Sequence, residues 1–370
     1  MKNIKKYARY FPAVTMTFLF FLCILIPLAL SNHKPNQISE LDNTSLMEWH
    51  EVTSGPFTEK FEQYVTERIG LRNSMIDKYI NLNDRLFHIL EHPTYTYGRD
   101  GYVFFNMPNE KNNPSYLKAF ASFINRMEKY LTDNDIYFLY CINPNKTQVY
   151  ADYLPAGANL TFARQKLLTE YLDKYNINYI DNTDLLVEAS KETDVFDKKY
   201  DAGHWNENGA YIGINNILTT LSLSFPDIPV NTLSDYNITE VVREKLPLSN
   251  FVINEPSLYF ERNNAEAVDV TADDTDIILD ENYRDYSHYI NPEHPELPKI
   301  LVFRGSYFLG KEKFMNESFS ESVFVHSYYN IFNLQYYVEK FKPDIILFES
   351  VEYATINKYF PKDMLKNTTF

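Results

Sequence analysis

The sequence Ile136-Tyr137-Phe138-Leu139-Tyr140-Cys141-Ile142 is a continuous apolar run with the length of one β-strand. A run without alternating polar positions indicates a strand that is buried on both faces, as in a parallel sheet. A helical pattern at 115–132 precedes it, and helical patterns at 162–175 and 182–190 flank a second strand at 178–180. This alternation predicts an α/β domain with a mostly parallel sheet between layers of helices.

Two further buried strands are expected at 299–303 and 344–349, and Arg304-Gly305-Ser306 and a helical piece follow the first of them. Residues 226–298 interrupt the pattern, because this stretch is rich in Asp, Glu, Pro and Asn. We interpret it as an acidic insertion that forms a lid or a wall of a substrate site. Short β-segments are expected within it at 257–262, 268–271 and 276–279.

The N-terminus has the pattern of a membrane anchor. Met1–Arg9 is basic, and the apolar run Phe11–Leu30 that follows is about as long as a bilayer core is thick. The basic flank predicts a cytoplasmic N-terminus and an extracytoplasmic remainder from residue 32 onward. A cleaved signal peptide is the alternative, but no clear small-residue cleavage site follows the run. We therefore expect a single-pass protein of the cell membrane.

The chain is expected to have three parts. Residues 1–35 form the basic flank and the anchor, and residues 36–97 a linker and a helical lead-in. The helical pattern of the lead-in runs from Phe57 to Leu90 and is broken at Gly70. Residues 98–370 form the α/β domain.

Composition restricts the possible partners. The formal charge of −15 argues against nucleic acid, and the 30 tyrosines suit sugar surfaces. Cys23 and Cys141 lie in two separate apolar runs, so no disulfide framework is expected. Five of the eight histidines are scattered without the spacing of metal ligands, and neither a metal site nor a cofactor is predicted. They are His88, His92, His288, His294 and His326.

The stretch Tyr200–Ala210 carries candidate chemistry. Asp201 precedes His204 by three residues, ahead of a helix that Asn206 or Asn208 can cap. A histidine held by a carboxylate can activate a hydroxyl nucleophile. The alternative interpretation of this stretch is a capped helix with a polar loop in front of it.

Ser306 and the loop Asn143–Lys146 each follow a buried strand, at the sheet edge where α/β proteins bind ligands. Backbone N–H groups after a strand end can face a developing oxyanion. An N-cap serine and an ordinary turn are the alternatives. Together with Asp201 and His204, however, Ser306 completes the parts of a Ser-His-Asp triad on one face of the sheet.

Six blocks of sequence follow one another in the order of a known family. They are Phe57–Arg72, Gly98–Phe105, Ile142–Pro155, His204–Ala210, Leu301–Tyr307 and Lys342–Glu352. In these blocks the chain resembles the SGNH-hydrolase-like proteins of the alginate O-acetyltransferase (AlgJ/AlgX) type and the related Asp-His-His-Trp (DHHW) group. The blocks span the chain from residue 57 almost to its end.

The resemblance implies a three-layer α/β/α domain of SGNH type, circularly permuted so that the Asp and His precede the Ser. It implies that Ser306 forms an acetyl-enzyme, that His204 is the general base, and that Asp201 orients the imidazole. Further candidates are, for the oxyanion, the Ser306 N–H, Asn145 and Arg304, and, for substrate binding, Trp205, Tyr307 and Lys146.

Two positions depart from the pattern of the family. Gly203 stands where the family usually has the Asp of Asp-x-His-Trp, so that Asp201 must reach His204 across two residues. The family usually has Gly-Asp-Ser or Gly-Thr-Ser, whereas this chain has Arg304-Gly305-Ser306, which leaves a glycine directly before the serine and puts a cation close to it. The wider SGNH esterases use the Asp-x-x-His spacing found here.

Three functions follow from this reading. The first is a membrane-anchored O-acetyltransferase acting on an exported polysaccharide or cell-wall polymer. Because one anchor helix cannot move acetyl groups across a membrane, it would need a multi-spanning acyltransferase as partner. The second is a carbohydrate acetylesterase with the same triad and water as acceptor. The third is an inactive glycan-binding or assembly protein.

Overall fold

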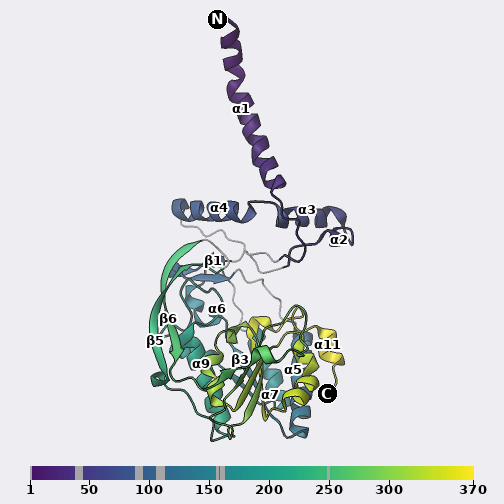
Figure 1. Cartoon of the computed structure of the whole chain (residues 1–370), viewed down its shortest axis with the longest axis vertical. Coiled ribbons are helices and arrows are strands. Elements are labelled where there is room, and N and C mark those ends of the chain that lie inside the picture. The colour runs from purple at the N-terminus through teal and green to yellow at the C-terminus, as the bar shows by residue number, and fades with distance from the viewer. Residues whose placement is uncertain are drawn as a thin grey trace. The chain divides into compact units, whose positions relative to one another are not determined.

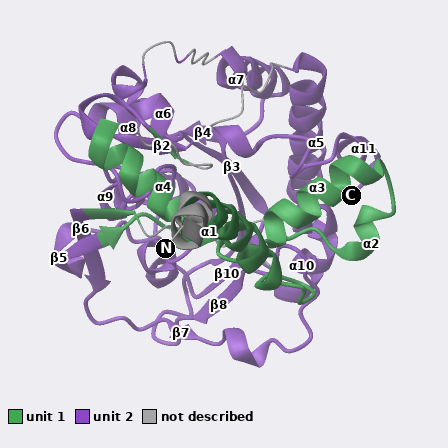
Figure 2. Cartoon of the chain, turned by 90° about the horizontal axis from the view of Figure 1, so that it is seen from above, with its two compact units in different colours: residues 1–96, 244–253 green, residues 97–243, 254–370 purple. Residues whose placement is uncertain are grey.

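The computed structural model describes residues 2–37, 45–87, 95–105, 113–155, 158, 163–247 and 251–370. Two compact units are present: residues 1–96 with 244–253, and residues 97–243 with 254–370 (Figure 2). The end of the predicted helical segment (88–90) and the histidines His88 and His92 lie outside the described residues. The three-part division expected from the sequence stays a prediction.

The first unit begins with a long helix that contains the predicted anchor. Within it, Pro12–Ala29 is long and apolar enough to cross a membrane, with a mean hydropathy of 2.2. The following helical segment is broken around Gly70, as predicted, since one helix ends at Arg68 and the next begins at Arg72. A glycine is needed at this position because a Cβ there would lie 2.5 Å from the Leu30 backbone oxygen. The helices are α1 (Lys2–Ala29), α2 (Trp49–Val52), α3 (Phe57–Arg68) and α4 (Arg72–Phe87) (Figure 1).

The second unit is built on a seven-stranded sheet with the order β4-β3-β11-β9-β10-β8-β7. The first five strands in this order are parallel, and β8 and β7 are antiparallel at one edge. Their bounds are β3 (Tyr137–Asn143), β4 (Tyr179–Asp181), β7 (Val268–Asp269), β8 (Tyr286–Ile290), β9 (Lys299–Arg304), β10 (Glu321–His326) and β11 (Ile345–Val351). The predicted mostly parallel sheet is therefore confirmed.

Helices cover both faces of this sheet, as alternate residues of β3 show. Tyr140 faces Phe120 of α5, with ring centroids 6.2 Å apart. Asn143 points the other way and accepts a 2.8 Å hydrogen bond from Asn182, whose amide also reaches the Gly213 carbonyl of α9. The remaining helices are α5 (Pro114–Asp133), α6 (Lys146–Val149), α7 (Ala163–Tyr175), α8 (Thr183–Ala189), α9 (Glu207–Ser222), α10 (Leu334–Phe341) and α11 (Lys362–Asn367). The fold is the predicted three-layer α/β/α arrangement.

Residues 226–298 contain more β-structure than the sequence predicts. They form the hairpin β5 (Tyr236–Lys245) and β6 (Val252–Arg262), and they supply β7 and β8 to the main sheet. The strand expected at 276–279 is absent, since these residues form a turn and irregular backbone. The hairpin was not predicted in full because its strands are largely exposed and carry mixed charges without a clear alternation.

The segment after β9 also differs from the prediction. Instead of a helical piece, three short 3-10 turns follow at Ser306–Phe308, Glu312–Phe314 and Asn316–Ser318. The strand β10 and the helix α10 were not predicted either. A separate small sheet pairs β1 (Tyr95–Tyr97) with β2 (Val103–Phe105).

Candidate active site

Asp201 and His204 lie in the loop that joins α8 to α9. The sequence predicted that they lie at the end of a strand, but the element before this loop is the helix α8. The Asp201 carboxylate accepts hydrogen bonds from the backbone N–H groups of Gly203 (3.1 Å) and His204 (3.0 Å). This local turn brings the carboxylate to the imidazole, 2.9 Å from Nδ1. The two intervening residues therefore do not prevent the Asp–His contact.

Gly203 is required in this turn by a close neighbour. A Cβ at this position would lie 2.2 Å from the Phe105 ring. The helix that follows begins at Asn206, whose side chain accepts a 3.0 Å hydrogen bond from the Gly209 N–H. The cap and the packed glycine hold the loop from both sides.

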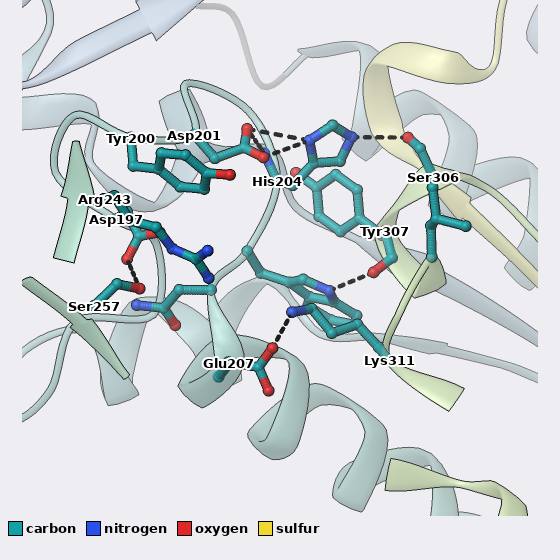
Figure 3. A pocket seen from close by; sticks show the side chains of 13 residues that line it. Asp197, Tyr200, Asp201, His204, Glu207, Arg243, Ser257, Ser306, Tyr307 and Lys311 are labelled. Atoms are coloured by element: carbon teal, nitrogen blue, oxygen red, sulfur yellow. Dashed lines mark hydrogen bonds and ion pairs between the residues drawn. The ribbon is translucent and has the colours of Figure 1, made fainter. Parts of the chain in front are cut away.

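Ser306 completes the arrangement across the sheet. Its Oγ lies 2.9 Å from His204 Nε2, so Asp201, His204 and Ser306 form one continuous chain of hydrogen bonds (Figure 3). The Ser306 N–H stands at the first position of a 3-10 turn, where N–H groups have no acceptor within the turn. It can therefore face an oxyanion, as the sequence predicts. The Tyr353 side chain also interacts with the Ser306 side chain.

The electrostatics of the pair suit a histidine that accepts a proton. Burial by itself lowers the pKa of His204, but the Asp201 carboxylate outweighs it and raises that pKa above its usual value. Burial raises the pKa of Asp201, but the His204 imidazole outweighs it and lowers that pKa to about 2. Asp201 is thus ionised at neutral pH, and it stabilises the imidazolium that forms when His204 takes a proton.

A pocket opens over these three residues, with walls from several elements (Figure 3). Lys311 donates a 2.5 Å hydrogen bond to Glu207 of α9, and Ser257 of β6 donates a 2.9 Å bond to Asp197. The lining residues that were not predicted from the sequence to serve the site are Asp197, Tyr200, Asn206, Glu207, Arg243, Ser257, Leu309 and Lys311. All of them except Glu207 lie in loops or in the hairpin of β5 and β6, where the sequence has no periodic pattern.

Trp205 and Tyr307 border the pocket, and the sequence predicted that they bind the substrate. This prediction is wrong, because neither side chain is exposed enough to stack on a sugar ring. Their side chains are packed in the core, with exposed fractions of 2% and 1%. The indole Nε1 donates a 2.7 Å hydrogen bond to the Tyr307 carbonyl, and the Tyr307 hydroxyl donates to the Gly203 carbonyl. Both residues instead fasten the His204 loop to the Ser306 turn.

Lys146, predicted to bind substrate, is buried away from the pocket surface. Its ammonium donates to the carbonyls of Val103 (2.8 Å), Lys198 (3.0 Å) and Asp201 (3.3 Å). Burial lowers its pKa to about 8, although Asp201 opposes this shift. Because its donors are used by the backbone, Lys146 holds the Asp201 loop in place rather than a ligand.

The two side chains predicted to bind the oxyanion are also engaged elsewhere. Asn145 caps α6 and donates to Glu352 at 3.3 Å. Arg304 is buried, and its guanidinium lies 3.6 Å from the Glu312 carboxylate. Neither residue lines the pocket.

Glu349 was not predicted from the sequence to serve the site, but it holds the backbone just before Ser306. It is fully buried in β11, where one carboxylate oxygen accepts the Gly305 N–H at 2.7 Å and the other accepts the Asn143 amide at 2.9 Å. Burial raises the pKa of Glu349 to about 7, and the two donors act against this shift. A single acidic residue inside the apolar run of β11 was the signal in the sequence.

Glu349→Gln is expected to destabilise the protein, and more so at pH 5 than at pH 8. An amide turns its NH2 toward one of the two donors, which costs about 1–3 kcal/mol. Because the folded pKa lies above the unfolded one, the contribution of Glu349 is present at low pH and is lost as pH rises toward about 7. Denaturant unfolding of both proteins at the two pH values measures the difference.

The exposed Glu339 provides the control for this experiment. Glu339→Gln should leave the free energy of unfolding unchanged at both pH values. A Glu349→Gln protein as stable as the wild type at pH 5 would show that the Glu349 carboxyl group does not support the Ser306 turn.

Within the described ranges, no group of three or more His, Cys, Asp or Glu side chains is arranged to hold a metal ion. A comparison with curated proteins finds no matching sequence.

Several solved structures share the fold. Bacillus cereus PatB1 superposes with a TM-score of 0.56 at 16% identity, covering 72% of this chain and 97% of PatB1. A DHHW family protein from Eubacterium siraeum has a TM-score of 0.51 at 15% identity, covering 73% and 94% of the two chains. The O-acetyltransferase domain of Pseudomonas putida AlgJ has a TM-score of 0.50 at 15% identity, covering 74% and 99%.

The family comparison agrees with these structures. Residues 96–276 match the family model described as the SGNH hydrolase-like domain of acetyltransferase AlgX. The matched range includes Asp201 and His204 and ends before Ser306, which is joined to them by the geometry described above. Residues 96–276 therefore resemble the SGNH hydrolase-like acetyltransferase domain of AlgX, and the resemblance seen in the sequence is confirmed.

Proposed function

We propose that this protein is a membrane-anchored O-acetyltransferase that acetylates hydroxyl groups of an exported polysaccharide or cell-wall polymer. The observation that carries the proposal is the hydrogen-bonded chain from Asp201 through His204 to Ser306, which opens into a pocket. The acetyltransferase family of the domain supports acetyl as the transferred group.

In the first half of the reaction, Ser306 Oγ attacks the carbonyl carbon of an acetyl donor while His204 Nε2 takes the hydroxyl proton. The Ser306 N–H stabilises the negative charge on the carbonyl oxygen. His204 then returns the proton to the leaving group, and the acetyl group remains as an ester on Ser306. Asp201 keeps the imidazole in the tautomer that has Nε2 free to accept the proton.

In the second half, a sugar hydroxyl in the pocket gives its proton to His204 and attacks the acetyl-serine. The ester bond to Ser306 breaks, Oγ recovers a proton from His204, and the acetylated sugar leaves. Water in the place of the sugar would make the same site an esterase. The identity of the acceptor is therefore what separates the two activities.

The apolar segment Pro12–Ala29 supports the anchored, extracytoplasmic part of the proposal. With the basic N-terminus in the cytoplasm, the catalytic domain lies outside the membrane. An acetyl donor must then reach it from the cytoplasm, and a multi-spanning membrane acyltransferase is the partner that we propose for this step.

The test uses the full chain in detergent with a chromogenic acetyl ester, with and without a glycan acceptor. Acetylated glycan that forms only with intact Ser306 supports the transferase. Ester hydrolysis at equal rates with and without acceptor identifies an esterase. The absence of both turnover and a Ser306 acetyl adduct contradicts both enzyme functions and leaves a binding protein.

Arg243 of the pocket wall is expected to contact the acceptor. Its guanidinium stacks 4.7 Å from the Tyr200 ring centroid, and its Nε is buried without a hydrogen-bond partner among the described residues. A hydrogen bond to a charged group is worth about 1.5–3 kcal/mol, so Arg243→Met should raise KM for the glycan about ten-fold or more. Acceptor-free ester hydrolysis should change little, because Arg243 does not contact the triad.

Initial rates at varied glycan concentration measure this effect. Arg284→Met is the control, since Arg284 is exposed and does not line the pocket. An unchanged KM in Arg243→Met would show that the acceptor binds elsewhere.

A further inference from the structure

Helices α2 to α4 carry exposed apolar side chains that the fold leaves uncovered. On α4 and at the residue before it, these are Leu71, Met75, Leu82 and Leu86, with exposed fractions of 48%, 46%, 54% and 59%. The spacings of seven and four residues between Met75, Leu82 and Leu86 place these three on one face of the helix. The opposite face carries the acidic Asp77 and Asp84.

A second group of exposed rings lies on α2 and α3. Trp49, Phe57 and Phe61 are 53%, 57% and 41% exposed. The Phe57 and Phe61 rings stack with centroids 5.6 Å apart, and Trp49 meets Phe61 edge to face at 6.4 Å. Aromatic side chains, tryptophan above all, concentrate where a bilayer meets water.

Backbone hydrogen bonds join the turn between α3 and α4 to the end of the candidate membrane span. The Gly70 N–H donates to the Pro27 carbonyl at 3.0 Å, and the Asn32 N–H donates to the Arg68 carbonyl at 2.8 Å. The buried Arg68 guanidinium adds bonds to the carbonyls of Asn32 (3.1 Å) and Lys34 (2.8 Å). The turn is therefore held at the point where α1 would leave the bilayer.

From this turn, α3 and α4 extend in opposite directions, across the axis of α1 rather than along it (Figures 1 and 2). A helix that crosses the end of a membrane span in this way lies in the plane of the bilayer surface. Lys78 and Arg85 flank the apolar face of α4, and both are exposed: Lys78 lies four residues before Leu82, and Arg85 lies one residue before Leu86. Basic side chains beside an apolar stripe are typical of helices that lie in the headgroup region.

We infer that α2, α3 and α4 form an interfacial platform, defined by Trp49, Phe57, Phe61, Leu71, Met75, Leu82 and Leu86, that binds the surface of the membrane in which α1 is anchored. The inference rests on the anchoring proposed above. The lipid surface is the occupant because the platform is continuous with the span through the Gly70–Pro27 and Asn32–Arg68 hydrogen bonds.

The two tryptophans of the chain provide the test, because Trp49 is exposed and Trp205 is buried. The full chain is reconstituted in vesicles of phosphatidylcholine and phosphatidylglycerol that carry bromine either near the headgroups or near the chain ends. Interfacial helices lie ~5–10 Å deep, so shallow bromine should quench Trp49 about two-fold more than deep bromine. Trp49→Phe should remove this quenchable component.

A second measurement follows the platform helix itself. Amide hydrogen exchange of residues 72–87 in these vesicles should be about ten-fold faster in Leu82→Asp than in the wild type, since a charge at the bilayer surface weakens burial of the stripe. Ser74→Asp adds the same charge at an exposed position of α4 off the stripe and should exchange like the wild type.

The outcomes separate the platform from the proposed function. A chain that floats with the vesicles but shows neither quenching of Trp49 nor slow exchange overturns the platform and leaves the anchor intact. This result would also favour a protein partner for the stripe. A chain that does not float overturns the anchor and the platform together. Acetyl transfer, measured in the same samples, depends on Ser306 and is independent of either result.

Discussion

Ser306→Ala is expected to abolish formation of the acetyl-enzyme and to lower acetyl transfer by about 10⁴-fold or more. The substitution removes the hydroxyl oxygen that lies 2.9 Å from His204 Nε2. Two neighbouring hydroxyls do not replace it: Tyr307 directs its hydroxyl to the Gly203 carbonyl, and burial raises the pKa of the Tyr353 hydroxyl beside Ser306, which makes it a poor nucleophile. Mass spectrometry of the chain after incubation with an acetyl ester measures the adduct, and the transfer assay measures the rate.

Ser257→Ala is the matched control for this variant. Ser257 lies in the same pocket, but its hydroxyl donates to Asp197 rather than to His204. It should retain the adduct and transfer within a few-fold of the wild-type rate. An acetyl adduct that persists in Ser306→Ala would place the nucleophile elsewhere in the chain.

Asp201→Asn is expected to lower the rate by about 10³–10⁴-fold while leaving the protein folded. Asn keeps the side-chain oxygen that accepts the Gly203 and His204 N–H groups, so the turn persists. Its NH2 group, however, faces His204 Nδ1 and makes this nitrogen an acceptor. The imidazole proton then moves to Nε2, which can no longer take the proton of Ser306.

The pH profile of the same variant distinguishes this mechanism from a general loss of structure. A base must be neutral to act, so the wild-type rate rises as pH passes the pKa of His204, which Asp201 raises. Without the carboxylate, burial lowers this pKa, and the acid limb of the residual activity should move to lower pH. Thermal unfolding checks that the fold is retained.

Asp197→Asn is the comparison, since Asp197 lies in the pocket but contacts Ser257. It should keep both the rate and the acid limb of the wild type. A residual Asp201→Asn activity with an unmoved acid limb would argue against the pairing of Asp201 with His204.

The central strands of the sheet could be predicted from the local pattern of apolar residues. The uninterrupted apolar runs that became β3, β9 and β11 predicted a buried parallel sheet, because burial on both faces leaves no place for polar residues. The strands β5, β8 and β10 were missed. They mix charged or polar residues with apolar ones, or lie next to loops without periodic pattern.

The candidate site divides in the same way. Asp201 and His204 stand three residues apart, so a single turn decides whether they meet. The hydrogen bond between the carboxylate and the imidazole was therefore predicted from the sequence. Arg304 and Lys146 were predicted to serve the ligand on the strength of their charge. Both are buried, the first beside Glu312 and the second against three backbone carbonyls.

By itself, the sequence determined the class of fold, the apolar N-terminal span and the pair Asp201–His204, since each depends on residues close along the chain. Only the tertiary structure decided that His204 meets Ser306, 102 residues away. It also decided that Glu349, on the neighbouring strand β11, accepts the N–H of Gly305, the residue before Ser306. The physical reason is that periodicity reports whether a residue is buried. The partner it meets depends instead on the order and register of strands that are distant in sequence.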